Sequence, residues 1–141
     1  MKFSKKSRYA IRALICLASS PNERLTLSTI AEKSNISLQY LEQVFASLRR
    51  SNIVRSVKGS QGGYILSSSP TALSVAQIVS ALEGAYQIEQ EPSDDSSSDA
   101  INTMIIDKAN TLFENLLNST SLQDLIDYCT EKETDEPMYF I

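Results

Sequence analysis

The residues best suited to chemistry lie in one run, residues 26–66, with the sequence TLSTIAEKSNISLQYLEQVFASLRRSNIVRSVKGSQGGYIL. Polar side chains gather in it at the start of a helical pattern, at Ser37, Gln39, Tyr40 and Gln43. Glutamine pairs with adenine through two hydrogen bonds, whereas serine and tyrosine more often contact phosphate. The run therefore favours recognition of a nucleic acid. The alternative is an ordinary solvated face of a helix.

Basic side chains flank these polar residues on both sides. They are Lys5, Lys6, Arg8, Arg49, Arg50, Arg55 and Lys58. Each of them, taken alone, is explained equally well as an ordinary surface charge. As a group around a glycine-rich segment they predict contacts to phosphates, and such contacts weaken as salt is added because binding releases counterions.

Charge is divided unevenly along the 141 residues. Residues 1–66 hold eleven basic and three acidic side chains, whereas residues 67–141 hold two basic and fourteen acidic ones. The net charge of −4 thus combines a basic half with an acidic half. We expect the basic half to bind a polyanion while the acidic half repels non-specific contacts. An unrelated solubilising acidic tail is the alternative.

Residue counts argue against most enzymatic and metal chemistry. The chain has no histidine, and its two cysteines, Cys16 and Cys129, are far apart. A disulfide framework, a structural zinc site and a histidine-based triad are therefore not expected. The run GSQGG lacks the Gly-Lys-Ser/Thr ending of a phosphate-binding loop, and no carboxylate pair or nucleophile–base set appears. We predict no enzymatic activity, no metal and no cofactor.

The basic N-terminus superficially resembles a signal peptide. Arg12 interrupts its apolar run, however, and leaves only residues 13–18. That stretch is too short for the apolar region of a signal peptide or for a membrane-spanning helix. We predict a cytoplasmic protein.

Hydrophobic periodicity predicts three helices in the first third of the chain. The first covers residues 3–19, Thr26 caps a short second one, and Ser37 caps a third that runs from Leu38 to about residue 51. The third helix is expected to bury Leu41, Val44, Phe45 and Leu48 and to expose Gln39, Tyr40, Gln43, Ser47 and Arg50.

Two short β-like runs, residues 53–57 and 64–66, follow around KGSQGG. Gly59, Gly62 and Gly63 permit the positive φ angles of a tight hairpin and the close approach of its backbone to another surface. Lys58 or Gln61 is expected in a minor groove, and Tyr64 is expected to pack its ring at the hairpin base. A helix that Ser74 caps and Gly84 ends comes next.

Residues 89–99, within the acidic half, are low in apolar residues and strongly acidic, which predicts a mobile linker or a loosely ordered loop. A long helix with a wide apolar stripe follows, and a second subunit is the best cover for such a stripe. The expected dimer contacts are Ile101, Met104, Ile105, Leu112, Phe113 and Leu116. A last short helix ends near Tyr128.

These elements together predict a mainly α fold with a small β-hairpin wing: a winged helix-turn-helix followed by a long C-terminal dimerisation helix. The expected divisions are a DNA-binding domain at residues 1–84, an acidic linker at 85–99, dimerisation helices at 100–128 and a tail at 129–141.

Three segments, SRYAIRALICLA, residues 27–66 and LSVAQIVSALEG, resemble the Rrf2 family of bacterial transcription regulators. The resemblance implies a winged-helix homodimer, paired through the long helix, that binds a palindromic operator. It carries the family's DNA-reading positions onto Ser37, Gln39, Tyr40 and Gln43 in the third helix. In the wing it carries them onto Lys58, Gly59, Gly62, Gly63 and Tyr64.

Two departures from the family pattern matter. Ser7 stands where the family usually has glycine. Iron–sulfur members place three cysteines just after the helix that ends in LEG, where this chain reads EQEPSDDSSSD. Because thiolates are the ligands of such clusters, a sensing role based on an iron–sulfur cluster is not transferred.

The tail is most similar to a cluster-free branch that represses cysteine metabolism and whose partner is cysteine synthase. Tyr139, Phe140 and Ile141 would then enter a pocket for an amino-acid carboxylate on that enzyme. Alternatively, the tail folds back as a strand or seals the dimer core. Thiol redox sensing at Cys16 or Cys129 and a small ligand between the domains also stay open.

A hypothesis of a different class is a protein-interaction adaptor that kept the fold and lost DNA binding. The retained basic residues and the glycine pair of the wing argue against it.

Overall fold

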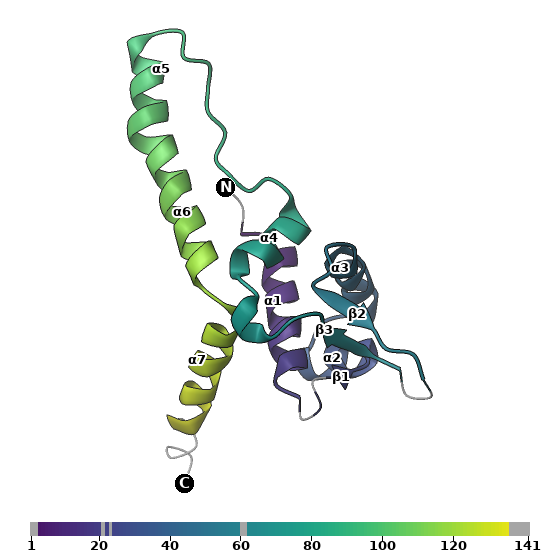
Figure 1. Cartoon of the computed structure of the whole chain (residues 1–141). Coiled ribbons are helices and arrows are strands. Elements are labelled where there is room, and N and C mark those ends of the chain that lie inside the picture. The colour runs from purple at the N-terminus through teal and green to yellow at the C-terminus, as the bar shows by residue number, and fades with distance from the viewer. Residues whose placement is uncertain (1–2, 21, 23, 60–61, 136–141) are drawn as a thin grey trace.

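A computed structural model describes residues 3–20, 22, 24–59 and 62–135. Its first part is a three-helix module of α1 (Lys5–Ala18), α2 (Leu27–Ser34) and α3 (Leu38–Arg50), to which α4 (Val75–Glu83) is added (Figure 1). α1 lies in the middle of this module and packs against α2, α3 and α4. The core formed there is mainly apolar, with Leu14, Leu17, Leu41, Phe45 and Ile78 completely buried.

Each of these helices begins at a hydroxyl side chain, as the sequence predicts for α2, α3 and α4. Ser4, Thr26, Ser37 and Ser74 accept a hydrogen bond from the backbone N–H three residues further along. Such a cap satisfies one of the amide groups that the first turn of a helix leaves unpaired. Gln77 completes a capping box by accepting from the Ser74 N–H over 2.8 Å.

The wing is a hairpin that belongs to a three-stranded antiparallel sheet. Its strands β1 (Arg24–Leu25), β2 (Val54–Ser56) and β3 (Tyr64–Leu66) lie in the order β1-β3-β2. The predicted hairpin corresponds to β2 and β3, in which Arg55 faces Ile65. β1 was not predicted, because two residues carry no alternating pattern and gain strand geometry only by pairing with β3.

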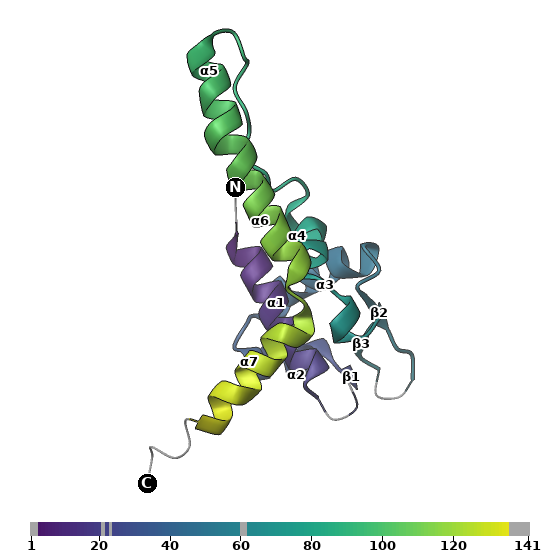
Figure 2. The same cartoon turned by 60° about the vertical axis from the view of Figure 1, so that its left-hand side comes forward.

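Residues 96–119, which are part of the acidic half, form a helical arm that projects from this module (Figures 1 and 2). It consists of α5 (Ser96–Ile101), the π-helical turn η2 (Asn102–Ile106) and α6 (Asp107–Ser119). The last helix, α7 (Leu122–Asp135), is tied to the module because the Leu122 N–H donates to the Leu73 carbonyl over 2.8 Å. A 3-10 turn, η1 (Pro70–Ala72), precedes α4. The predicted fold class, mainly α with a β-hairpin wing, is confirmed.

Two expected boundaries differ from the structure. The helical arm begins at Ser96, inside the segment expected as a linker, because the Asp95 carboxylate caps it by accepting from the Ser98 N–H over 2.8 Å. The hydrogen bonds that Ser98 donates to this carboxylate, chiefly from its backbone N–H, hold the pKa of Asp95 below its ordinary value. α7 continues to Asp135, seven residues beyond Tyr128, where the last helix was expected to end.

Ser7 has a specific role where the family resemblance expects glycine. Its side chain is fully buried between α1 and α4, and its hydroxyl donates to the Glu83 carboxylate over 2.9 Å. The Ser4 N–H donates to the same carboxylate over 3.0 Å. The hydroxyl therefore joins the start of α1 to the end of α4.

Candidate nucleic-acid interface

The exposed side of α3 presents a continuous polar surface. Asn35, with φ of 55°, makes the left-handed turn after α2, and the buried Ile36 anchors that turn before α3 begins. Gln39 and Gln43 are exposed, one turn apart, and the Ser37 hydroxyl accepts from the Tyr40 N–H over 3.2 Å. Two of the predicted contact residues thus point to solvent, while Ser37 also caps the helix.

Two residues of α3 that were expected on its exposed side have structural partners. Tyr40 is half-buried, and its ring meets Tyr9 of α1 edge to face, with 5.5 Å between centroids. Ser47, expected on the exposed side, is only 5% exposed and accepts from the Arg50 guanidinium over 3.1 Å. The expectation for Ser47 was wrong because a small hydroxyl residue fits at the edge of a packed face when a partner satisfies it. Arg49 and Arg50 are exposed at the end of α3.

The basic residues of α1 do not form one group. The Lys5 ammonium and the Arg12 guanidinium both lie 5.4 Å from the centre of the Tyr9 ring, beside α3. Arg12 was not predicted as a contact residue. Arg8 instead donates to the Phe3 carbonyl over 3.1 Å and lines an apolar groove with Leu116 of α6. The structure therefore does not bring Arg8 together with the predicted DNA contacts, and Lys6 is half-buried.

The wing carries exposed positive charge on a backbone that requires glycine. Arg55 and Lys58 are exposed. Gly63 has φ of 121°, and a Cβ atom there would lie 2.9 Å from the Leu25 carbonyl oxygen. Glycine at position 63 therefore follows from the close pairing of β1 with β3, whereas Gly62 has a φ of 54° and no such close neighbour. Gly59, with φ of 140°, has no such neighbour; Gln61 lies outside the described residues.

Tyr64 joins the wing to α3. Its half-buried ring packs edge to face on Phe45, with 5.0 Å between centroids and an interplanar angle of 70°. Because Phe45 is completely buried, this contact fixes the wing base to the inner face of α3. The expected position of the Tyr64 ring at the hairpin base agrees with this contact.

Two exposed residues at the start of α3 were not predicted. Leu38 is 40% exposed although it is a large apolar residue. Glu42 is exposed between Gln39 and Gln43 in sequence. A leucine in such a position contacts the thymine methyl group, and a glutamate accepts from the cytosine amino group. From the sequence, an apolar residue at the start of a helix is expected in the core. Only its exposed fraction in the structure identifies Leu38 as a surface residue.

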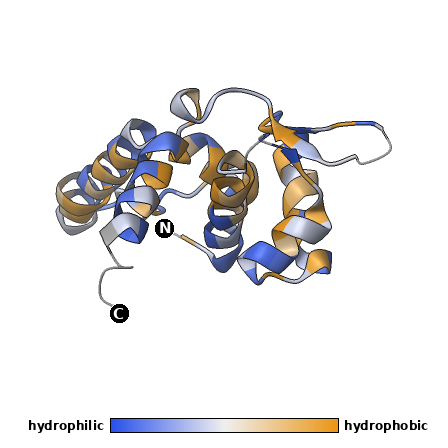
Figure 3. Ribbon diagram, turned by 90° about the horizontal axis from the view of Figure 1, so that it is seen from below, coloured by the Kyte–Doolittle hydropathy of each residue, from blue (hydrophilic) through white to orange (hydrophobic). Residues whose placement is uncertain are grey.

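The arm exposes an apolar face along its length. Leu112 is 72% exposed, Met104 64%, and Ile105 and Leu116 each 59%. Ile101 continues the same set at 43%. Phe113, which was expected among them, instead packs edge to face on Tyr86 of its own chain, with 5.9 Å between centroids. Figure 3 shows the apolar colouring of this end of the molecule, far from the wing.

Two asparagines bind the segment between α4 and α5, residues 85–95, to the arm; we call this segment the connector. The Asn110 side chain accepts from the Ile88 N–H over 2.8 Å and donates to the Ile88 carbonyl over 3.0 Å. Asn102, only 6% exposed, makes the same two bonds to Glu91, over 3.2 and 2.7 Å. Each amide thus pairs with the backbone as a neighbouring strand would, and these bonds hold the connector against the arm.

Within the described residues, no three His, Cys, Asp or Glu side chains are grouped so as to hold a metal ion. Cys16 and Cys129 are both half-buried free thiols, and Cys16 packs against the core. In the same part of the chain, no helix combines the length and the apolar character needed to cross a membrane.

Comparison with known proteins places this arrangement in a family. The family profile named Rrf2, described as an iron-dependent transcriptional regulator, matches residues 3–128. The HTH-type transcriptional regulator CymR of Bacillus subtilis is 35% identical over 143 residues, which cover 100% of both chains. The chain therefore belongs to the Rrf2 family of transcriptional regulators, and it is not an enzyme.

Solved structures share the fold over almost the whole chain. The structure of CymR, titled the global cysteine regulator of B. subtilis, has a TM-score of 0.80 at 32% identity and covers 91% of this chain and 98% of its own. The structure of T. potens IscR has a TM-score of 0.78 at 32% identity, covering 99% and 97%. The winged-helix module and the arm are thus both similar to those of known regulators.

The asparagine pairing predicts a measurable protection of the connector. Asn110→Ala removes two hydrogen bonds, each worth about 1 kcal/mol, so the connector should open at least about tenfold more often. Cleavage by a glutamate-specific protease after Glu89, followed by mass spectrometry, measures this opening. Asn115→Ala, at an exposed position of the same helix, is the matched control. Equal cleavage of the two variants would contradict the role of Asn110.

Proposed function

We propose that this chain is a homodimeric repressor that lays α3 in the DNA major groove and its wing over the flanking minor groove. The observation that carries this proposal is the exposed polar side of α3, held between Tyr9 of α1 and Tyr64 of the wing. Gln39 and Gln43 then read base edges, and Arg49, Arg50, Arg55 and Lys58 contact phosphates. Lys5 and Arg12 add positive charge beside α3.

The proposed dimer pairs the exposed apolar faces of two arms. Ile101, Met104, Ile105, Leu112 and Leu116 supply this face, and a second copy removes it from water. A two-fold pairing presents two copies of α3, which matches a palindromic operator. The acidic charge of the arm keeps it from competing with the wing for DNA.

The proposed signal concerns cysteine supply. Support comes from the full-length similarity to CymR, whose structure is titled a global cysteine regulator. The partner we propose is cysteine synthase, contacted through Tyr139, Phe140 and Ile141, which lie outside the described residues. An iron–sulfur signal has no support in the sequence of the connector, which contains no cysteine.

Removing one phosphate contact tests DNA binding by the wing. Lys58→Ala should weaken binding several-fold on every sequence and lower the slope of log K against log salt by about one. Fluorescence anisotropy with the DNA that co-purifies with the protein, titrated at several salt concentrations, measures both. The control is Lys132→Ala, an exposed lysine on α7. Identical slopes for the two variants would exclude Lys58 from the interface, and a protein with no sequence preference at any salt would be an adaptor.

Deleting Phe140 and Ile141 tests the partner. The shortened protein should lose binding to cysteine synthase, because the terminal carboxylate and its apolar side chain are gone. It should keep its dimer, because the arm is untouched. Isothermal titration measures the first property and sedimentation the second. Unchanged affinity for the enzyme would remove the tail from the mechanism.

A further inference from the structure

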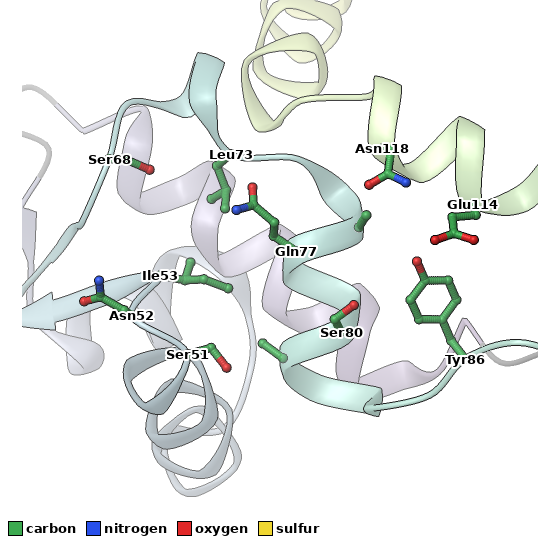
Figure 4. A pocket seen from close by; sticks show the side chains of 12 residues that line it. Ser51, Asn52, Ile53, Ser68, Leu73, Gln77, Ser80, Tyr86, Glu114 and Asn118 are labelled. Carbon is green, nitrogen blue, oxygen red and sulfur yellow. The ribbon is translucent and has the colours of Figure 1, made fainter.

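A cavity of about 470 Å³ lies between the arm and the module formed by α1, α2, α3 and α4. Its walls come from α4, α6, the start of the connector and the turn between α3 and β2 (Figure 4). Ile53 and Leu73 form an apolar part of the lining. This volume is in the range of small-molecule sites, whose apolar surfaces typically surround a few oriented polar groups.

Four polar side chains of the cavity lining have no hydrogen-bond partner among the described residues. The Glu114 carboxylate, the Asn118 amide and the hydroxyls of Ser80 and Tyr86 line it, and within the described part of the chain none of them makes a hydrogen bond. Figure 4 shows Tyr86 with its hydroxyl directed toward the side of Glu114 and Asn118. These groups are therefore free to bind a ligand.

The wall that carries Tyr86 is held in place. Phe113 contacts the Tyr86 ring edge to face, and Asn110 holds the backbone of Ile88, two residues further along. The hydroxyl is thus oriented before any ligand arrives, which lowers the entropy lost on binding.

The charge of the cavity selects a cation. Among the described residues that line it, Glu114 is the one charged residue, and none is a lysine or an arginine. Ser51 is the C-cap of α3, and Ser80 and Ala81 lie in the last turn of α4. Helix C-termini carry partial negative charge, so both ends add to the field of Glu114. A zwitterionic amino acid would place its carboxylate where no cation meets it.

We propose that this cavity binds a small alkyl amine, its ammonium group on Glu114 and its carbon chain on Ile53 and Leu73. Glu114 and Asn118 each follow the exposed Leu112 and Leu116 by two residues, a rotation of about 200° around α6. Pairing of two arms through the leucine face therefore leaves the cavity open.

The ligand would touch α6 on one side and, at Ser51 and Asn52, the turn that joins α3 to the wing on the other. A bound ligand thus links the arm to α3 and the wing. The regulatory role of that link rests on the proposed function. Binding of the amine does not, because it requires no DNA.

Isothermal titration of the full-length, DNA-free protein with n-butylamine tests the site. We expect one amine per chain, at least about tenfold weaker binding by Glu114→Gln, and unchanged binding by the control Glu131→Gln, an exposed residue of α7. The uncharged isostere 1-butanol and the zwitterion L-serine should not bind.

Absence of n-butylamine binding at millimolar concentration, or equal affinity in Glu114→Gln and wild type, would overturn the proposal. So would tighter binding of L-serine than of n-butylamine. Circular dichroism of Glu114→Gln checks that the variant is folded. Each of these failures leaves DNA binding untouched, whereas loss of operator binding alone would remove the proposed function and leave the amine site.

Discussion

The reading surface depends on the way α3 is held from two sides by aromatic contacts. Tyr9 meets Tyr40 on the outer edge of the helix, and Tyr64 meets the buried Phe45 on the inner face. Edge-to-face pairs have a preferred geometry in addition to their buried area, so they fix the rotation of α3 as well as its distance. Gln39 and Gln43 keep one common direction only while that rotation is maintained.

α4 connects this surface to the arm. It packs against α3 on one side and α6 on the other, and Glu83 at its end accepts hydrogen bonds from the start of α1. The connector then returns along the arm, held at Ile88 and Glu91 by asparagine side chains. Asparagine hydrogen bonds and the contact between Tyr86 and Phe113 therefore hold the region after Glu83 against the arm. A displacement of the arm has a direct route to α3 through α4.

Local rules account for what could be predicted from the sequence. The caps at Thr26, Ser37 and Ser74 and the apolar stripes need only neighbouring residues, so the helices of the module were predicted correctly. The misses depend on distant partners. β1 forms only against β3, Phe113 turns inward because Tyr86 lies there, and Ser47 is buried beside Arg50. The amino-acid composition of the connector suggests a loose loop because composition does not show which distant residues pair. In the structure, the side chains of Asn102 and Asn110 bond the connector backbone as a neighbouring strand would.

The central claim is that two copies of one reading head, α3 with its wing, meet the DNA together. Hydroxyl-radical footprinting on the co-purifying DNA tests both parts of that claim at once. A two-fold arrangement predicts two symmetric protected patches on one face of the duplex, about one helical turn of 10–10.5 base pairs or a multiple of it apart. A single protected patch, or protection that is uniform along the fragment, would contradict it.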